Sequence, residues 1–181
     1  ISGKKAEVYV DTEVHNSGKR TRTVAVETVL ADAGDVPVKR ISQQVKLQAG
    51  ESKTVRQQFA VRNPKLWSPD SPYLYRIQSR VKAGHEVLDG GVTRVGIRKA
   101  EFKGKDGFWL NGKPFGQLVG ANRHQDFAYV GNALPNSQQW RDAKRLRDAG
   151  CTIIRVAHYP QDPSFMDACD ELGMFVIVAT P

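Results

Sequence analysis

The chain has 181 residues, of which 40% are hydrophobic and 25% charged, as is ordinary for a soluble globular protein. No run approaches the roughly 18 apolar residues of a membrane span, so we expect no membrane partner. The two cysteines, Cys151 and Cys169, are too few for a disulfide framework or a zinc site, and both lie in apolar patterns. We therefore expect buried free thiols and no metal site.

The net charge of +8 is concentrated in the first half of the chain. Residues 1–98 carry 17 Lys and Arg against 10 Asp and Glu, whereas residues 99–181 carry 10 against 9. A basic half suggests nucleic acid or an anionic surface. However, no recognition helix, aromatic stacking platform or Arg-rich cluster accompanies it. We therefore expect a solvated strand face and no nucleic-acid partner.

Apolar and polar residues alternate through most of residues 1–98, and a period of two predicts strands with one buried face. The alternating positions are Ala6, Val8, Val10 and Val14; Val24, Val26, Thr28 and Leu30; Ile41, Val45 and Leu47; Val55, Phe59 and Val61; Tyr73, Tyr75, Ile77 and Val81; Val87; and Val95 and Ile97. The breaks are turn-forming residues: Asn16-Ser17-Gly18, Gly34-Asp35, Ala49-Gly50-Glu51, Ala83-Gly84 and Gly90-Gly91. About seven short strands at this spacing predict an antiparallel immunoglobulin-like β-sandwich over residues 1–98, without the Cys…Trp…Cys pattern of antibody domains.

Trp67 lies in the proline-rich stretch "NPKLWSPDSPYLY". Prolines cannot join a central ladder, so we expect a connection that packs against the sandwich. An aromatic face could stack on a sugar, but the more economical interpretation of Trp67 is a buried anchor.

After Lys99 the pattern changes to strands that alternate with helices. Asn111-Gly112 predicts a hairpin turn, and residues 117–122 predict a short strand. The first helix should begin with Asn136 or Ser137 as its cap, place Trp140, Ala143, Leu146 and Ala149 on one side, and end at Gly150. The second should have Asp162 as its cap and Pro163 in its first turn, place Phe165, Cys169 and Leu172 on one face, and end at Gly173. Buried strands are predicted at residues 152–157 and 174–178.

Strand, helix, strand, helix, strand predicts parallel pairing with right-handed crossovers. Residues 99–181 therefore have the pattern of the first three strands of a TIM (β/α)₈ barrel, or of a doubly wound sheet. In a barrel the active site lies at the carboxyl ends of the strands. Polar residues capable of directional hydrogen bonds gather there, and they suit a hydroxyl-rich substrate: Asn122, His124, Asp126, Arg155 and His158.

Each of these residues also has a structural interpretation. The histidines could bond backbone carbonyls in loops, and Arg155 could pair with an acidic residue inside the fold. Two histidines on one rim also suggest a metal site. However, the number of ligands and their spacing argue against it, and we predict no metal ligand.

Two stretches, "FWLNGKPFGQLVGANRHQD" and "TIIRVAHYPQDPSFMDACDELGMFVIVATP", resemble the start of the catalytic barrel in glycoside hydrolase family 2. "LWSPDSPYLY" and "GIRKAEF" resemble the end of the immunoglobulin-like domain that precedes that barrel. The chain departs from the usual family pattern at Thr152, Val156 and Gln125, where the family has Asn, a small residue and commonly Glu.

The resemblance implies a retaining glycosidase in which one carboxylic acid protonates the leaving oxygen and a second carboxylate attacks the anomeric carbon. In the family both are glutamates, after barrel strands four and seven. They would lie beyond residue 181, which leaves this fragment inactive and without a catalytic residue of its own. The resemblance gives His124 and His158 contacts to sugar hydroxyls and to the transition state, and places Arg155 under the nucleophile.

The resemblance also bears on substrate, cofactor and location. Asn122-Arg123-His124 favours a β-galactosidase-like parent over a glucuronidase. No cofactor is evident in the fragment, while the family is compatible with a divalent cation, with a homo-oligomer and with the bacterial cytoplasm or periplasm. The alternative function is a carbohydrate-binding or spacer module without turnover.

Overall fold

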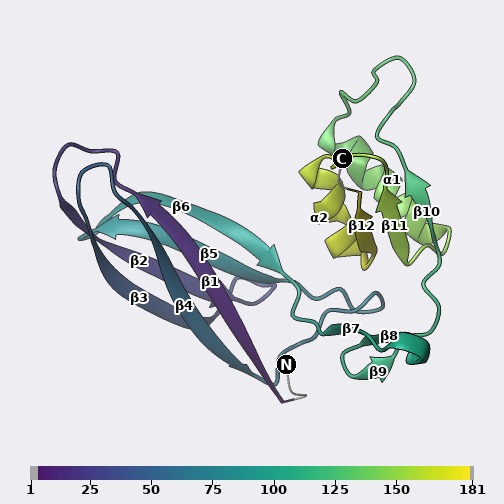
Figure 1. Cartoon of the computed structure of the whole chain (residues 1–181), viewed down its shortest axis with the longest axis horizontal. Coiled ribbons are helices and arrows are strands. Elements are labelled where there is room, and N and C mark those ends of the chain that lie inside the picture. The colour runs from purple at the N-terminus through teal and green to yellow at the C-terminus, as the bar shows by residue number, and fades with distance from the viewer. Residues whose placement is uncertain (1–3, 180–181) are drawn as a thin grey trace. The chain divides into compact units, whose positions relative to one another are not determined.

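The computed structural model describes residues 4–179, which form two compact units (Figure 1). The first contains the described residues up to Lys65 together with Leu74–Ile97. The second contains Leu66–Tyr73 and the described residues from Arg98 onward. The proline-rich connection around Trp67 thus belongs to the second unit.

The first unit is an antiparallel β-sandwich, as predicted (Figure 1). Its strands are β1 (Lys5–His15), β2 (Arg22–Ala31), β3 (Pro37–Leu47), β4 (Ser52–Arg62), β5 (Tyr75–Ala83) and β6 (Glu86–Val95). β1 pairs with β4, and the second sheet has the order β3-β2-β5-β6. The prediction of seven short strands was wrong in one respect. Gly90-Gly91 lies within β6 instead of in a turn, so two expected short strands are one long strand.

The alternation of the sequence produces the core of the sandwich. Val14, Val24, Val26, Leu47 and Val55 pack together between the two sheets. Each fully buried side chain of this kind contributes about 1.5–3 kcal/mol relative to an exposed one. The core therefore follows directly from the period of two in the sequence.

The second unit begins with a small antiparallel sheet of β7 (Ala100–Phe102), β8 (Phe108–Leu110) and β9 (Lys113–Pro114), with a 3₁₀ turn at Gly104–Asp106. Asn111 and Gly112 join β8 to β9 with φ of 53° and 81°. Positive φ at both central residues is the requirement of a tight hairpin turn, and Asn-Gly meets it best. The predicted hairpin is confirmed.

Three parallel strands and two helices follow, in the pattern that opens a (β/α)₈ barrel (Figure 1). They are β10 (Gly120–Arg123), α1 (Asn136–Asp148), β11 (Ile153–Val156), α2 (Pro163–Leu172) and β12 (Phe175–Val178), with the strand order β10-β11-β12. Each predicted strand is present, although shorter than expected. No helix in the described part of the chain is long and apolar enough to cross a membrane.

The helices pack on the sheet through Ile154, Val156, Phe165 and Cys169, all completely buried. Burial raises the pKa of the Cys169 thiol to about 12, because the thiolate would lose its hydration. The prediction of a buried free thiol is confirmed for Cys169, whereas Cys151 is only partly buried.

The ends of α2 match their sequence signals. The Asp162 carboxylate accepts a hydrogen bond of 2.8 Å from the backbone N–H of Ser164, with Pro163 in the first turn. Gly173 ends the helix with φ of 75°. A Cβ on Gly173 would also come within 2.4 Å of the Pro69 carbonyl oxygen. This position therefore requires glycine for two reasons.

The prediction for α1 was less accurate. Its cap is Pro135, with no side-chain hydrogen bond, so neither Asn136 nor Ser137 caps it. Trp140 is 42% exposed and donates its indole N–H to Glu171 Oε2 at 3.1 Å. Ala149 is also exposed. The buried stripe runs through Gln139, Ala143 and Leu146, because Gln139 has a polar partner inside the fold.

Trp67 is 1% exposed, so the predicted buried anchor is confirmed. Its indole N–H donates to the Asp170 carbonyl at 2.8 Å, and its ring packs edge-on against Phe175 with centroids 5.3 Å apart. The Asn111 side chain donates to the Trp67 carbonyl at 3.0 Å. Trp67 is thus anchored in the second unit, while the beginning of its segment bonds the sandwich unit, where the Lys65 N–H donates to the Tyr75 hydroxyl at 2.9 Å.

Candidate functional site

The carboxyl ends of β10 and β11 bring Asn122 and Arg155 side by side. The two strands are parallel, and Asn122 is the register partner of Arg155. Asn122 lies within β10, as it does in the strand predicted at residues 117–122. Arg155 is partly buried in β11. These two side chains therefore come from neighbouring strands at the same end of the sheet.

The two histidines predicted to bind substrate lie near Arg155. One guanidinium nitrogen of Arg155, Nη2, lies 3.5 Å from Nδ1 of His158. The His124 and His158 rings meet edge to face with centroids 5.5 Å apart, and the Tyr159 ring lies 6.1 Å from that of His124. The Ala157–His158 peptide is cis. Both histidines are exposed, so their ring nitrogens can reach a bound molecule.

Beside these residues the sheet is hollowed. Asn122 and Arg155 line a shallow cavity of about 310 Å³, together with the apolar residues Leu118, Gly120, Ala121, Ile153 and Ile177. The Asn122 amide and the Arg155 guanidinium supply directional donors at one edge of an apolar floor, and the His158 imidazole lies beside Arg155. Such a surface suits a ring with hydroxyls on its edge and C–H bonds on its face, as in a sugar.

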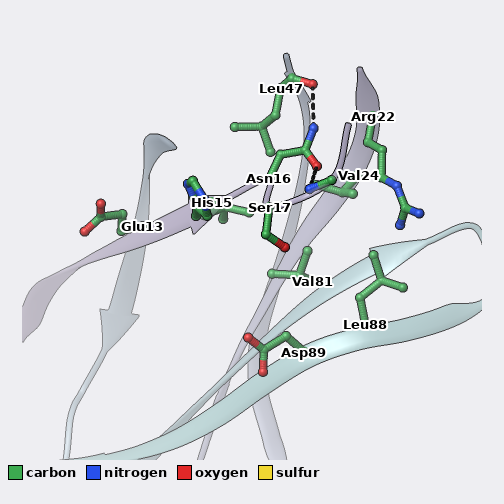
Figure 2. Close-up of a pocket in the computed structure, with 12 residues that line it drawn as sticks. Glu13, His15, Asn16, Ser17, Arg22, Val24, Leu47, Val81, Leu88 and Asp89 are labelled. Carbon is green, nitrogen blue, oxygen red and sulfur yellow. Dashed lines mark hydrogen bonds between the residues drawn. The ribbon is translucent and has the colours of Figure 1, made fainter. Parts of the chain in front are cut away.

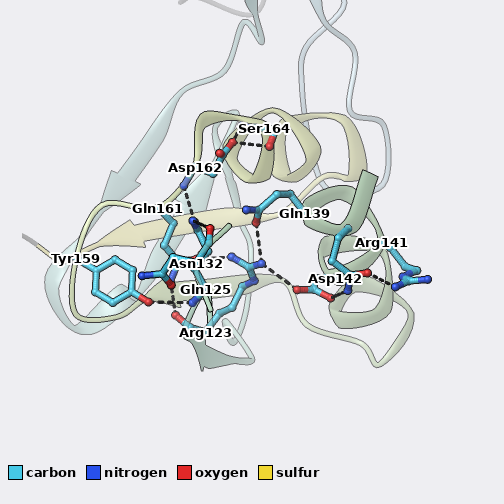
Figure 3. Close-up of polar contacts among 11 residues, drawn as sticks. Arg123, Gln125, Asn132, Gln139, Arg141, Asp142, Tyr159, Gln161, Asp162 and Ser164 are labelled. Carbon is cyan, nitrogen blue, oxygen red and sulfur yellow. Dashed lines mark hydrogen bonds and ion pairs between the residues drawn. The ribbon is translucent and has the colours of Figure 1, made fainter. Parts of the chain in front are cut away.

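Arg123 lies next to Asn122 in β10, but its side chain is buried among hydrogen-bond partners (Figure 3). It is 6% exposed and donates to Gln161 Oε1 at 2.6 Å, to Gln139 Oε1 at 2.8 Å and to Asp142 Oδ2 at 2.9 Å. Its guanidinium carbon also lies 4.0 Å from the centre of the Phe165 ring. Successive side chains of a strand point to opposite faces, so Arg123 faces the helices and holds them to the sheet.

Gln125 fixes the loop that follows β10 (Figure 3). Its backbone N–H donates to the Tyr159 hydroxyl at 3.0 Å, and its side-chain Oε1 accepts from the Asp162 N–H at 2.7 Å. Its side-chain amide also donates to the Asn132 carbonyl at 3.3 Å. Sequence reasoning singled out Gln125 only as a departure from Glu and missed this positioning role.

The acidic side chains near the strand ends have different surroundings. Asp126 is exposed in the loop after β10. Asp162 accepts hydrogen bonds from the side chain and backbone of Ser164, which hold its pKa below the usual range. Asp142 pairs with Arg123. Asp142 and Asp162 therefore stabilise the fold, and only Asp126 is exposed toward solvent.

Within residues 4–179, no three His, Cys, Asp or Glu side chains are grouped closely enough to hold a metal ion. Thr180 and Pro181, which follow the third strand in the sequence, lie outside the described residues.

A separate cavity of about 500 Å³ opens in the sandwich (Figure 2). Val14, Val24, Leu47 and Val81 are its apolar lining, and Ser17, Arg22 and Asp89 are among its polar residues. The Asn16 amide donates to the Leu47 carbonyl at 3.3 Å and shapes its edge. None of the five residues predicted to bind substrate lines this cavity, so it is no part of the candidate site.

A β-sandwich followed by the first strands of a (β/α)₈ barrel, with donors at the strand ends, is the arrangement of a barrel-type glycosidase. Comparison with known proteins agrees. Residues 1–98 match the family described as glycosyl hydrolases family 2, and residues 101–181 match its TIM barrel domain. The chain belongs to glycosyl hydrolases family 2.

Individual relatives have two different activities in their names. A β-galactosidase of Thermoanaerobacter pseudethanolicus is 43% identical over 130 residues, which cover 71% of this chain and 17% of that protein. Solved structures include a family 2 member from Bacteroides cellulosilyticus, with TM-score 0.93 and 35% identity over 99% of this chain and 24% of its own. Another is β-glucuronidase 2 of Bacteroides uniformis, covalently bound to cyclophellitol-6-carboxylate aziridine, with TM-score 0.92 and 30% identity over 98% of this chain and 22% of its own.

The chain spans about a fifth of the length of the curated relatives that it matches, between 17% and 21% for the first three.

Proposed function

We propose that the full-length protein is a retaining β-glycosidase, with β-galactosides as its substrates, and that this chain supplies part of the sugar-binding surface. The observation that carries the proposal is the grouping of Asn122, His124, Arg155 and His158 at the carboxyl ends of two parallel strands. That end of a barrel is where catalytic and binding residues lie.

Each residue has a role in this proposal. His124 and His158 hydrogen-bond sugar hydroxyls, and their contacts strengthen as the transition state forms. Arg155 lies beside the nucleophilic carboxylate and keeps it ionised, because an adjacent cation lowers a carboxylate pKa. Asn122 orients the sugar next to Arg155, its register partner. Asp126 binds a hydroxyl from the following loop.

The two catalytic glutamates are proposed to come from later barrel strands, beyond residue 181, so that the 181-residue chain alone has no activity. Retention requires two carboxyl groups about 5–5.5 Å apart across the sugar. Of the acidic residues near the described strand ends, Asp142 of α1 already holds Arg123, and Asp162 already caps the start of α2. The covalent complex of the Bacteroides uniformis relative supports a nucleophilic mechanism in the family.

The identity of the sugar is a more specific part of the proposal. The relatives named above include both a β-galactosidase and a β-glucuronidase. The Asn122-Arg123-His124 run favours a galactoside, as does the 43% identity to the Thermoanaerobacter β-galactosidase. Since Arg123 is buried in a structural network, any such preference would act through Asn122 and His124.

The test is a panel of nitrophenyl β-galactoside, β-glucuronide, β-mannoside and β-glucoside, hydrolysed by the full-length protein and by its His158→Phe variant. We expect the highest kcat/KM on the galactoside. The variant should have a lower kcat as well as a higher KM, because a contact made in the transition state acts on kcat. His85→Phe, in the exposed turn before β6, is the matched control. Unchanged kinetics in His158→Phe would make His158 structural, and a preference for the glucuronide would overturn the choice of sugar.

A further inference from the structure

The loop from His124 to Pro135, between β10 and α1, contains a turn that is closed by its own backbone. The Phe127 N–H donates to the Gly131 carbonyl at 3.1 Å, and the Gly131 N–H donates back to the Phe127 carbonyl at 2.9 Å. The Val130 N–H also donates to the Phe127 carbonyl, at 3.3 Å. The tip of the loop therefore has a defined shape of its own.

The base of the same loop is fixed to the segment between β11 and α2. Gln125 bonds Tyr159 and Asp162 on one side and the Asn132 carbonyl on the other (Figure 3). Leu134 is 9% exposed and anchors the end of the loop in the interior. A closed turn on a fixed base presents its side chains in set positions.

Those side chains are apolar and face solvent. Phe127, Tyr129 and Val130 are 46%, 106% and 49% exposed. Tyr129 has φ of 71°, in the left-handed region that bulky residues rarely adopt. Glycine or asparagine would suit that backbone better, so the fold holds a large ring outward at a conformational cost. Backbone outliers of this kind gather at binding sites.

The tip is close in sequence to the candidate site. Phe127 follows His124 by three residues, and the loop extends beyond the carboxyl end of β10 (Figure 1). The polar donors at the strand ends suit the hydroxyls of the sugar that is cleaved. The apolar tip offers no such donors apart from the Tyr129 hydroxyl, and its rings suit an apolar or aromatic surface.

We propose that Phe127 and Tyr129 form a stacking platform for the leaving group of the β-glycoside, with Tyr129 as the main contact. This role rests on the proposed function, since it needs a glycoside in the site. In this role the loop determines which leaving groups the enzyme prefers, while the strand-end residues bind the sugar itself.

The test uses the full-length protein and two substrates that share one sugar, the nitrophenyl β-glycoside and the glycosyl fluoride. The fluoride has no ring in its leaving group. In Tyr129→Ala, kcat/KM on the nitrophenyl glycoside should fall roughly 2- to 10-fold, the size of a single ring–ring contact, with the fluoride unchanged. Tyr129→Phe should retain the activity. Tyr129→Asn, which tolerates positive φ, should show the same selective loss with a melting temperature no lower than that of the unaltered protein. Tyr9→Ala, at an exposed tyrosine of β1, is the control.

An equal loss on both substrates would overturn the proposal, because it would mean that Tyr129 packs against another part of the protein. Unchanged kcat/KM on both substrates in Tyr129→Ala and Tyr129→Asn would also overturn it. If the unaltered full-length protein hydrolyses neither substrate, the proposed function fails, and the platform fails with it.

Discussion

Arg123 and Arg155 lie on adjacent strands, but the same substitution should have different effects at the two positions. Arg123→Met should lower stability, whereas Arg155→Met should lower activity. In Arg123→Met the buried guanidinium disappears from Gln139, Gln161 and Asp142. Hydrogen bonds to charged groups contribute about 1.5–3 kcal/mol each, and removing one partner of a buried ion pair costs about 3–5 kcal/mol. These terms are not additive, and Asp142 is 22% exposed and can be rehydrated. We therefore expect a loss of about 3–4 kcal/mol in the free energy of unfolding.

Arg155→Met should cost less than about 1 kcal/mol, because its partly exposed guanidinium makes one long contact, 3.5 Å, to His158. In the full-length protein this variant should nevertheless lose activity, because the site loses its cation. Arg123→Met should instead lose stability first, and its remaining folded fraction should retain activity.

The assay is urea unfolding of the 181-residue chain, monitored through tryptophan fluorescence. All three tryptophans, Trp67, Trp109 and Trp140, belong to the second unit, so the signal reports on that unit alone. Equal midpoints for Arg123→Met and Arg155→Met would refute the assignment of these two arginines to different roles. A loss below about 1 kcal/mol in Arg123→Met would refute the stabilising network.

Three further changes can be tested by unfolding or thiol labelling. Gly173→Ala should cost about 3 kcal/mol or more, because the new Cβ clashes with a backbone carbonyl at positive φ, whereas Gly150→Ala, with φ of 90° but open space around it, should cost about 1 kcal/mol. Asp162→Ala should cost about 1 kcal/mol at neutral pH through the lost helix cap. The pKa of Asp162 is lowered in the folded state, so its charge stabilises the fold above the ordinary carboxyl pKa. This stabilisation disappears as the pH falls through the folded-state pKa. The urea midpoints of Asp162→Ala and the unaltered chain should therefore converge in acid. Cys169, with a pKa of about 12, should resist Ellman's reagent at pH 8 in a Cys151→Ala variant until denaturant is added, and rapid native labelling would contradict its burial.

The sandwich was largely predictable because one buried face imposes a period of two on the sequence. The exception, Gly90-Gly91, has a physical cause. A Cβ on Gly90 would come within 2.8 Å of the Ser79 carbonyl oxygen, so glycine is needed inside β6 for close backbone approach. Sequence alone cannot distinguish that requirement from a turn.

In the second unit, α2 was predicted accurately because its cap and its terminal glycine are local signals. The buried side of α1 was misjudged because Gln139 lies inside the fold only where Arg123 satisfies its amide oxygen. That pairing joins residues 16 positions apart and leaves no mark in the helical period. The alternation of β10 did contain a usable signal, since an inward Asn122 requires Arg123 to face the helices.

The strand-end rule placed all five predicted site residues on one rim. Asn122, Arg155, His124 and His158 are brought together, whereas Asp126 is exposed in the loop after β10. The conformation of the loop after β10 depends on the Gln125 contacts with distant residues, so the exposure of Tyr129 was not predictable from periodicity.

The most direct test of the central claim compares the full-length protein with the 181-residue chain on the four nitrophenyl glycosides. We expect hydrolysis by the long form alone, because the chain supplies sugar-binding residues and the catalytic glutamates are proposed to lie beyond residue 181. A folded long form that hydrolyses none of the four would favour a carbohydrate-binding role over catalysis. Turnover by the 181-residue chain would show that the catalytic carboxylates lie within this chain and would overturn the proposed function.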